Sequence, residues 1–437
     1  MNKCAPHDEL VWGTSPYAPT VDQRIKRARI ATIFLFFANG IALSALTPRL
    51  ADLQGQLSMS DISLGLVLSA GAAGGLFFGP FAAIGIKRLG SGPFAMYSLL
   101  IMLPLLPLVG IAPTAGALAL VMFAIGAIDS VLDASQNAHG LEVQRIYQRS
   151  IINNMHAFWA LGSVVGALVG ALTLVLDISL GWSLLGVSIA GFVGTLITFN
   201  WVLPRSSASD QNADEQSFES AIASEISADH LSALDPSSIA PAHRISGWKM
   251  TGPTMLPLLG LGVLIVLAVV VEEVPQRWSS IYLTDIGMAA NNVGFGVVAF
   301  TISLTVGRFL GDSFVNRFGE RLVAQVSMSV VAVALAASLF VGNDIGFIAA
   351  CAVVGFGVAT LFPAAMHAAT YIPGISPGNA ITVVSWMSRA GFVFTPLLVG
   401  IISENLGTQW GIGIAVIAAL LIIPLARFLR NTTDAQS

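Results

Sequence analysis

Charged residues are unusually scarce in this chain of 437 residues. Only 10% of its residues are Asp, Glu, Lys or Arg, whereas 55% are hydrophobic and the mean hydropathy is +0.80. Soluble domains contain about 25% charged residues, so this composition excludes an ordinary soluble protein. The net charge of −4 carries little information, because seven of the 24 acidic residues lie in one polar stretch between residues 205 and 244.

Cysteines and catalytic motifs are equally scarce. The two cysteines, Cys4 in a polar N-terminal segment and Cys351 within an apolar run, form neither a disulfide framework nor a metal-binding pattern. The sequence has no phosphate-binding loop, no cluster of metal ligands and no nucleophile triad. This pattern argues against an ATP-driven pump and against an enzyme. We expect no cofactor, no metal and no nucleic-acid partner.

Long apolar runs, by contrast, are abundant. Each run has about 18 residues or more, which is enough to cross the hydrocarbon core of a bilayer as a helix. We therefore predict an all-α membrane protein with twelve transmembrane helices, at residues 30–48, 62–86, 93–112, 115–137, 153–175, 183–203, 254–276, 292–314, 322–341, 346–369, 379–402 and 410–428.

Lysine and arginine predict the orientation of these helices. Sixteen of the 20 basic residues lie in the N-terminal segment, in connections that follow even-numbered spans, or after the last span. Arg49 is the clear exception on the other face. Basic residues gather on the cytoplasmic side of membrane proteins, so both termini are predicted to be cytoplasmic.

A polar segment rich in Ser, Ala and Asp separates the sixth and seventh spans. Its composition is typical of a linker rather than of a folded domain. The predicted organisation is a cytoplasmic N-terminal tail, a six-helix bundle, a cytoplasmic linker, a second six-helix bundle and a cytoplasmic C-terminal tail, at residues 1–29, 30–203, 204–253, 254–428 and 429–437.

The two predicted bundles resemble each other at one constant offset along the chain. The positions that match at this offset are Gly65 and Gly294, Arg88–Gly90 and Arg317–Gly319, Gly126 and Gly355, and Gly162 and Gly391. Glycine is common in this chain, so one match is expected by chance, but four in one register indicate an internal repeat. Two parallel six-helix repeats joined by a central linker resemble the architecture of major facilitator transporters.

The loop after the eighth span supports this resemblance. The stretch "GDSFVNRFGERL" is similar to the superfamily's G-x-x-x-D-R-x-G-R-R loop, with Arg317, Gly319 and Arg321 at matching places. Its N-terminal counterpart, "AAIGIKRLGSGP", keeps Arg88 but has Lys87 where the acidic residue belongs. The alternative is a pair of ordinary positively charged cytoplasmic loops, with these residues playing only structural or gating roles.

Three longer stretches resemble the fucose-permease-like branch and its orphan bacterial members, over nearly the whole chain. They begin at "FFANGIALSALTPRLADL", "DASQNAHGLEVQR" and "EEVPQRWSSIYLTDIG". In the fucose:proton symporters, an acidic residue four positions before an Asn on the fourth helix is implicated in proton coupling. Asp133 and Asn137 match that pair. The symporters also carry an acidic residue on the first helix, where this chain has only neutral polar residues such as Asn39.

Carboxylates within apolar helices form the main candidate site. An ionised Asp at the centre of a spanning helix costs about 2.5–3.5 kcal/mol, so it should face a cavity or a partner. Asp129, Asp133 and Asn137 are spaced to share one face of the fourth helix. They predict a site for a proton or for the solute, with Asp133 near the cytoplasmic boundary. The alternative is a gate salt bridge, for example between Asp133 and Arg149.

Helix seven offers a second pair of carboxylates. Glu272 and Glu273 lie about four-fifths of the way along the predicted span, just before Pro275, which loosens the helix. Glu272 is a candidate for proton or solute binding, since it matches an acidic residue of the orphan relatives, and the alternative is an interfacial carboxylate. Glu273 is interpreted as solvated.

The remaining polar residues in spans are weaker candidates. Arg308 and Asp312 are expected to form a structural ion pair near the cytoplasmic end of helix eight. Arg389 either binds an anionic group or pairs with the helix-eight carboxylate. Together with Asn137, the candidates for binding solute are Asn39, His156, Trp159, Trp278, Trp386 and Arg389, although a His or Trp in a spanning helix is more often a packing residue.

The function predicted from these features is proton-coupled uptake of a small polar organic solute, such as a sugar or related metabolite, by alternating access. The expected location is the bacterial cytoplasmic membrane, and the expected state is a monomer in the lipid bilayer. Uptake is favoured because helix five lacks the Gly-Pro of many drug antiporters. The alternatives are an antiporter that exports drugs or metabolites, and a transporter-like membrane sensor.

Overall fold

The structure is a computed structural model that describes residues 23–147, 151–204 and 252–429. Most of the predicted N-terminal tail, the linker at 204–253 and the predicted C-terminal tail lie outside the described residues. Arg149, the suggested gate partner of Asp133, also lies outside them.

The N-terminal half contains six apolar helical spans, several of which are interrupted by short 3₁₀ turns. Its α-helices are α1 (Gln23–Ser44), α2 (Leu50–Gln56), α3 (Asp61–Phe78), α4 (Ala82–Leu89), α5 (Ser91–Met102), α6 (Leu106–Ile111), α7 (Ala115–Tyr147), α8 (Ile152–Val175) and α9 (Leu180–Thr198). Prolines stand near the beginning of the 3₁₀ turns η1 (Thr47–Arg49), η2 (Gly79–Phe81) and η3 (Leu103–Leu105), where the missing N–H of proline interrupts regular helical hydrogen bonding.

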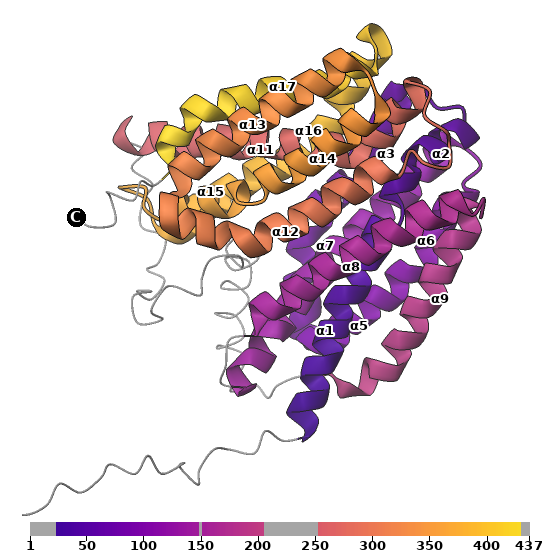
Figure 1. The fold of residues 1–437 in the computed structure, drawn as a ribbon. Coiled ribbons are helices and arrows are strands. Elements are labelled where there is room, and N and C mark those ends of the chain that lie inside the picture. Colours follow the sequence, from indigo (N-terminus) through magenta and orange to yellow (C-terminus); the bar gives the residue numbers. More distant parts are fainter. Residues whose placement is uncertain (1–22, 148–150, 205–251, 430–437) are drawn as a thin grey trace, which may run out of the picture.

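The C-terminal half repeats this arrangement with another six spans. Its α-helices are α11 (Gly252–Asp285), α12 (Phe295–Phe318), α13 (Glu320–Val341), α14 (Asp344–Val358), α15 (Leu361–Ala369), α16 (Pro377–Leu406) and α17 (Thr408–Leu425). Across the described residues, twelve helical spans are long and apolar enough to cross a membrane, as predicted. Figure 1 shows the two halves as two helical bundles lying side by side.

Two functionally important helices are longer than predicted. The helix α7 has 33 residues, so Asp129 and Asp133 lie on either side of its midpoint rather than toward its end. The helix α11 continues through Pro275 to Asp285, and Glu272 is the 21st of its 34 residues. The apolar runs ended too early because polar residues that face the protein interior interrupt the hydrophobic pattern.

The internal repeat inferred from the sequence is visible in the helix contacts. A Cβ atom on Gly126 would collide with the carbonyl of Gly71, and one on Gly355 would collide with the carbonyl of Phe300, which matches Gly71 at the same offset. Small residues at these positions allow two helix backbones to approach closely. The same helix pair therefore packs in the same register in each half, α3 with α7 and α12 with α14.

The matching loops also share one backbone conformation. Gly90 and Gly319 have φ angles of 89° and 80°, which side chains larger than glycine rarely adopt, and each residue ends one helix and begins the next. Arg88 and Arg317 thus occupy the last turn of equivalent helices. The repeat inferred from glycine spacing is a repeat of structure.

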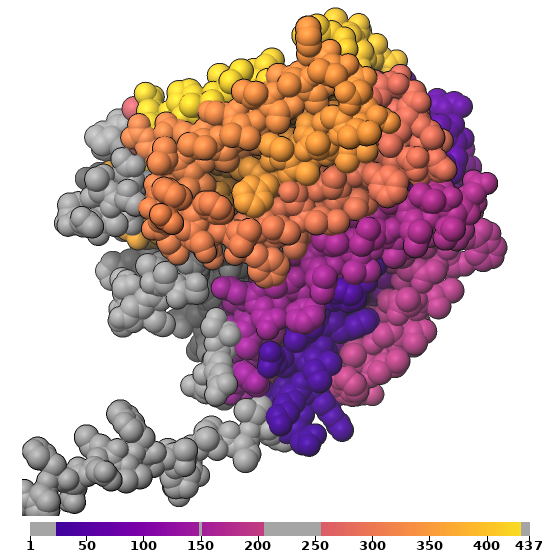
Figure 2. Space-filling view, viewed as in Figure 1, coloured from indigo at the N-terminus to yellow at the C-terminus, as the bar shows by residue number. Residues whose placement is uncertain are grey.

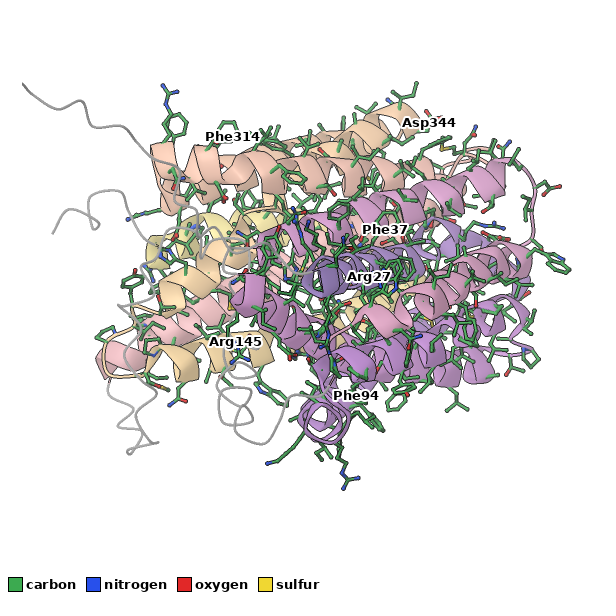
Figure 3. All side chains as sticks on the ribbon, turned by 90° about the horizontal axis from the view of Figure 1, so that it is seen from below. Arg27, Phe37, Phe94, Arg145, Phe314 and Asp344 are labelled. Atoms are coloured by element: carbon green, nitrogen blue, oxygen red, sulfur yellow. The ribbon has the colours of Figure 1, made fainter. Side chains whose placement is uncertain are left out.

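Large apolar side chains cover the outside of both bundles. Phe340, Leu120 and Trp182 have 93%, 73% and 71% of their surface exposed. A soluble monomer rarely exposes so many apolar side chains, whereas a bilayer solvates them. Figure 3 shows side chains projecting all round the helices, with Phe314 toward one end of the C-terminal bundle and Asp344 toward the other.

The two halves touch at the end of the molecule that is opposite the described chain ends. There Gly65 and Gly400 bring α3 and α16 into contact, with Gly65 against the carbonyl of Pro396 and Gly400 against that of Asp61. Gly294 packs on Pro48 and Ala171. The bundles diverge toward the end where α1 begins and α17 finishes, as seen in Figures 1 and 2. The described residues of the two halves are therefore in close contact at this end.

The close helix approach gives a testable prediction about stability. The substitution Gly355→Ala places a methyl group against the backbone of α12, so the helices must separate, at a cost of about 1–3 kcal/mol. Gly413→Ala is the matched control, because no atom lies within 4 Å of its added Cβ. Thermal unfolding of the purified protein in detergent should show a lower melting temperature for the first variant and no decrease for the second. Equal melting temperatures for both would contradict the packing described here.

Candidate functional site

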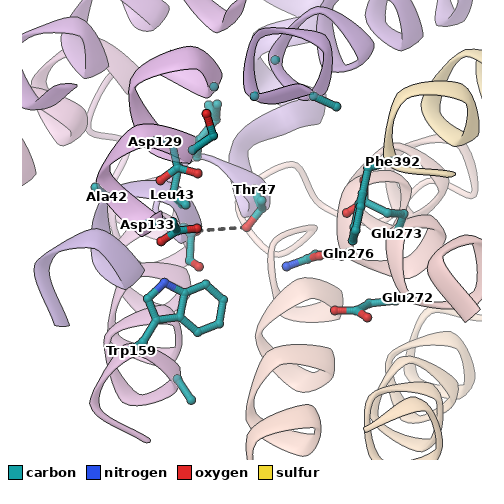
Figure 4. A pocket seen from close by; sticks show the side chains of 18 of the residues that line it. Ala42, Leu43, Thr47, Asp129, Asp133, Trp159, Glu272, Glu273, Gln276 and Phe392 are labelled. Carbon is teal, nitrogen blue, oxygen red and sulfur yellow. Dashed lines mark hydrogen bonds between the residues drawn. The ribbon is translucent and has the colours of Figure 1, made fainter. Parts of the chain in front are cut away.

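A central cavity of about 660 Å³ lies between the two halves. Polar and charged side chains line it from α7 and α8 on one side and from α11, α12 and α16 on the other. We call the lining residues before position 204 the N wall and those after position 251 the C wall. Figure 4 shows Asp129 and Asp133 on the N wall, with Glu272 and Gln276 across the cavity.

The first polar group at the N wall is a chain of three side chains from three helices, in which Asp129 and Trp159 line the cavity and Asn39 is not part of the lining. Trp159 on α8 donates from Nε1 to Oδ1 of Asn39 on α1, over 2.7 Å. Asn39 in turn donates from Nδ2 to Oδ1 of Asp129 on α7, also over 2.7 Å. Asn39 is completely buried. Because it is held from both sides, it fixes the orientation of the Asp129 carboxylate.

Asp133 is the centre of the second group. The side-chain amide of Gln136 donates to Oδ1 of Asp133 over 2.7 Å, and that of Asn137 donates to the backbone carbonyl of Asp133 over 3.0 Å. All three residues line the cavity. The spacing along α7 thus places Asp129, Asp133 and Asn137 on one face, as the sequence predicted.

The C wall carries two ion pairs. Glu272 on α11 lies 4.0 Å from Arg308 on α12, and both side chains are partly exposed to the cavity. Glu273 accepts a hydrogen bond from Arg277, one turn further along α11. Glu273 is only 3% exposed, so its interpretation as a solvated carboxylate was wrong. Its exposure was misjudged because the predicted span ended at residue 276, nine residues before the end of α11.

Arg308 has a partner on the neighbouring helix. The sequence suggested an ion pair with Asp312 within helix eight, which stays a prediction, and the structure places the Arg308 guanidinium 4.0 Å from Glu272 of α11. Asp312 and Arg389 both line the cavity. The two alternatives for Arg389, binding of an anionic group and pairing with the helix-eight carboxylate, stay predictions.

The aromatic candidates divide into two groups. His156 and Trp159 line the cavity, and the ring of His156 packs edge-on against Phe36 at 5.1 Å. Trp278 is 2% exposed and packs in the core of the C-terminal half rather than in the cavity lining. Trp386 is 52% exposed and also lies outside the lining. Neither tryptophan is therefore part of the lining of this cavity.

The four loop residues lie away from the cavity. Arg88, Arg317, Gly319 and Arg321 occupy the turns between the second and third spans of each half, at the end where the described termini lie. The guanidinium of Arg317 stacks over the ring of Phe318 at 5.4 Å. These positions fit a structural or gating role, which stays a prediction.

Sequence reasoning missed a polar cluster in each half, near the same loops. In the N-terminal half, Ser91 donates to Glu142 over 2.7 Å and lies 3.3 Å from Nδ1 of the fully buried His139. Ser91 is far from the other two members in the sequence, and no local pattern links them. They tie the beginning of α5 to α7.

The C-terminal cluster occupies equivalent positions. His367 is hydrogen-bonded to Glu320, and its ring packs against Tyr371 at 5.3 Å. Glu320 and Tyr371 match Ser91 and Glu142 at the offset of the repeat, so the carboxylate has exchanged places between the halves. The repeat offset was the signal that would have revealed these clusters.

Comparisons with known proteins agree with this architecture. Residues 247–437 match the family model of the Major Facilitator Superfamily. The chain is 26% identical to the membrane protein MosC of Rhizobium meliloti over 86% of this chain and 84% of that protein. It is 22% identical to an uncharacterized MFS-type transporter of Yersinia pestis, over 93% of this chain and 96% of that protein.

Solved structures share the fold. The nucleoside transporter NupG superposes with a TM-score of 0.66 at 14% identity, over 93% of this chain and 98% of that one. A bacterial homolog of the human lysosomal transporter Spinster, in an inward-facing and unoccupied conformation, gives a TM-score of 0.64 at 13% identity, over 93% and 98%.

The twelve helical spans are those of a multi-pass membrane protein. The chain resembles the major facilitator superfamily, whose model matches residues 247–437, and an MFS-type transporter is similar to it over most of its length. This resemblance supports secondary transport of a small-molecule solute. The resemblance to the fucose-permease-like branch stays a prediction.

Proposed function

We propose that the protein is a proton-coupled transporter that takes up a small polar organic solute, such as a sugar or related metabolite, by alternating access. One observation carries this proposal. A central cavity of about 660 Å³ lies between the halves and holds membrane-embedded carboxylates on both walls, with Asp129 and Asp133 facing Glu272. Ionisable residues at membrane depth mark ion and substrate pathways.

The arrangement of the halves supports alternating access. The halves are closed at the end opposite the described termini and diverge toward the other end. With both termini in the cytoplasm of a bacterial cell, this is a state open to the inside. Rocking about the cavity would expose Asp133 and Glu272 to the two sides in turn, because they belong to different halves.

The walls suggest separate roles within this mechanism. Asp133 is the proposed proton site, and Glu272 is a proposed second site for proton or solute. Asn137, His156, Trp159 and Arg389 supply hydrogen bonds and ring surface to the solute, and Asn39 acts by holding Asp129. A monomer is sufficient, because the described residues of one chain line both walls of the cavity.

The proposal is tested by flux in proteoliposomes that contain a trapped pH-sensitive dye. Concentration gradients of hexoses, amino sugars, polyols, nucleosides and organic acids are imposed in turn. At least one solute should change the internal pH, and an imposed proton gradient should drive its accumulation. A solute that moves at the same rate without any proton movement would contradict proton coupling. Binding without flux would favour a sensor, and solute exit driven by inward proton movement would favour an exporter.

A further inference from the structure

A second cavity, of about 550 Å³, lies at the end of the N-terminal half where α1 begins and α9 finishes. Its described lining comes from the first turns of α1, the first turn of α5, the 3₁₀ turn η4 (Phe199–Trp201) and the residues just after it. None of these lining residues belongs to the central cavity. The volume is within the range of ligand pockets, about 300–1,000 Å³.

Basic and amide side chains form the polar part of the second cavity. Arg24 and Arg27 both line it and are exposed, and their spacing places them side by side on one face of α1. Gln23 and Asn200 add two amide side chains. The described lining contains no acidic residue. Guanidinium groups with further hydrogen-bond donors nearby are the usual binding partners of a phosphate group.

The other basic residues at the beginning of α1 are placed differently. Arg29 donates a hydrogen bond to the hydroxyl of Tyr147 over 3.0 Å, and its guanidinium lies over that ring at 5.2 Å from the centroid. Lys26 is exposed but is not part of the cavity lining. The positive charge of the cavity therefore comes from two particular arginines and not from the whole basic segment.

An apolar strip joins the second cavity to the outer surface of the bundle. Phe199 lines the cavity and packs edge-on against Tyr97 of α5, with 5.1 Å between the ring centroids. Tyr97 is 44% exposed, and Ile101, one turn further along α5, is 58% exposed. Trp201 also lines the cavity, and tryptophan is enriched where a membrane protein meets the membrane–water interface. A ligand that fits both the cavity and the strip has an anionic head and an apolar tail.

We propose that the second cavity binds the phosphate headgroup of an anionic phospholipid between Arg24 and Arg27. One acyl chain of this lipid lies along the strip formed by Phe199, Tyr97 and Ile101. Basic residues beside a spanning helix attract anionic lipids in general, and the cavity makes this attraction specific to one place on the protein. The site is separate from the central cavity, so it does not depend on the solute or on proton coupling.

Native mass spectrometry of the full-length protein in detergent tests the selectivity of the site. Phosphatidylglycerol should form a one-lipid complex at a concentration about tenfold lower than phosphatidylcholine with the same acyl chains. Arg27→Gln should weaken this binding about fivefold, the effect expected for one basic residue near a lipid surface. Lys26→Gln is the matched control, because it removes an equal charge from the same turn of α1 outside the cavity, and it should change binding less than about twofold.

A photoactivatable phosphatidylglycerol with a diazirine in one acyl chain tests the location. Crosslinked peptides of the wild type should come from α5 around Tyr97 and from η4 around Phe199, and Arg27→Gln but not Lys26→Gln should reduce their yield. The proposal is overturned by equal binding of the two lipids, by equal losses in the two variants, or by crosslinks spread evenly over the lipid-facing helices. Displacement of the lipid by an equimolar amount of inorganic phosphate would also overturn it, because the site would then be one for a soluble anion.

Discussion

Replacing Asp133 by asparagine should abolish accumulation of solute against a gradient while leaving solute exchange across the membrane. Asp133 lies near the midpoint of α7 and lines the cavity. An amide keeps an oxygen that can accept the hydrogen bond from Gln136, so the local geometry is maintained. It cannot take up and release a proton, and the proton gradient can no longer be used. The solute that gives the largest proton signal with the wild type is the probe.

The measurement compares two transport modes in the same proteoliposomes. Accumulation driven by an imposed pH gradient should fall at least tenfold, whereas exchange of labelled for unlabelled solute should change less than about threefold. Asp177→Asn is the matched control, because Asp177 is an exposed carboxylate in the connection between α8 and α9. Full accumulation by the Asp133 variant would assign Asp133 a structural role and make Asp129 the next candidate for the proton site.

The sequence was sufficient to predict the architecture, because the bilayer imposes simple rules. Each span must be long and apolar, and basic residues cluster at one side. Helices can approach closely only where their residues are small. The matching glycines Gly126 and Gly355 therefore mark equivalent helix contacts in the two halves, although few other residues match. The apolar composition of a span is a local property, and the matching glycines recur at a constant spacing. Both patterns can be recognised in a single sequence.

The partners of the buried charges could not be predicted in the same way. Spacing on one helix placed Asp129, Asp133 and Asn137 on one face, since helical geometry is fixed. Asn39 and Trp159 belong to two other helices, far from Asp129 in the sequence, and they meet it only through packing of three helices. Spacing suggested Asp312 as a partner of Arg308, whereas the contact of Arg308 with Glu272 joins two helices and no spacing indicates it. Contacts between helices depend on their rotation, which local patterns do not encode.

Neutralising the two adjacent carboxylates of α11 should have different effects. Glu272→Gln should change solute binding, whereas Glu273→Gln should lower the stability of the protein. Glu272 is partly exposed to the cavity and lies 4.0 Å from Arg308, so its charge acts mainly on the cavity contents. Glu272→Gln should change the apparent affinity for solute about tenfold, or shift its dependence on pH, with little change in melting temperature. Binding and melting experiments on the same preparation measure both quantities.

Glu273→Gln should instead destabilise the protein. Glu273 is buried and paired with Arg277, and removing one partner leaves a guanidinium group without its carboxylate. Arg277 is 27% exposed, and hydration therefore limits the loss to about 1–3 kcal/mol, below that of a fully buried pair. The double variant Glu273→Gln with Arg277→Gln should recover most of the lost stability, because neither charge then remains unpaired.

If the Glu273→Gln variant has the melting temperature of the wild type, the ion pair contributes nothing to stability. If Glu272→Gln leaves both affinity and pH profile unchanged, Glu272 takes no part in proton coupling, and Asp129 and Asp133 of α7 become the first candidates for it.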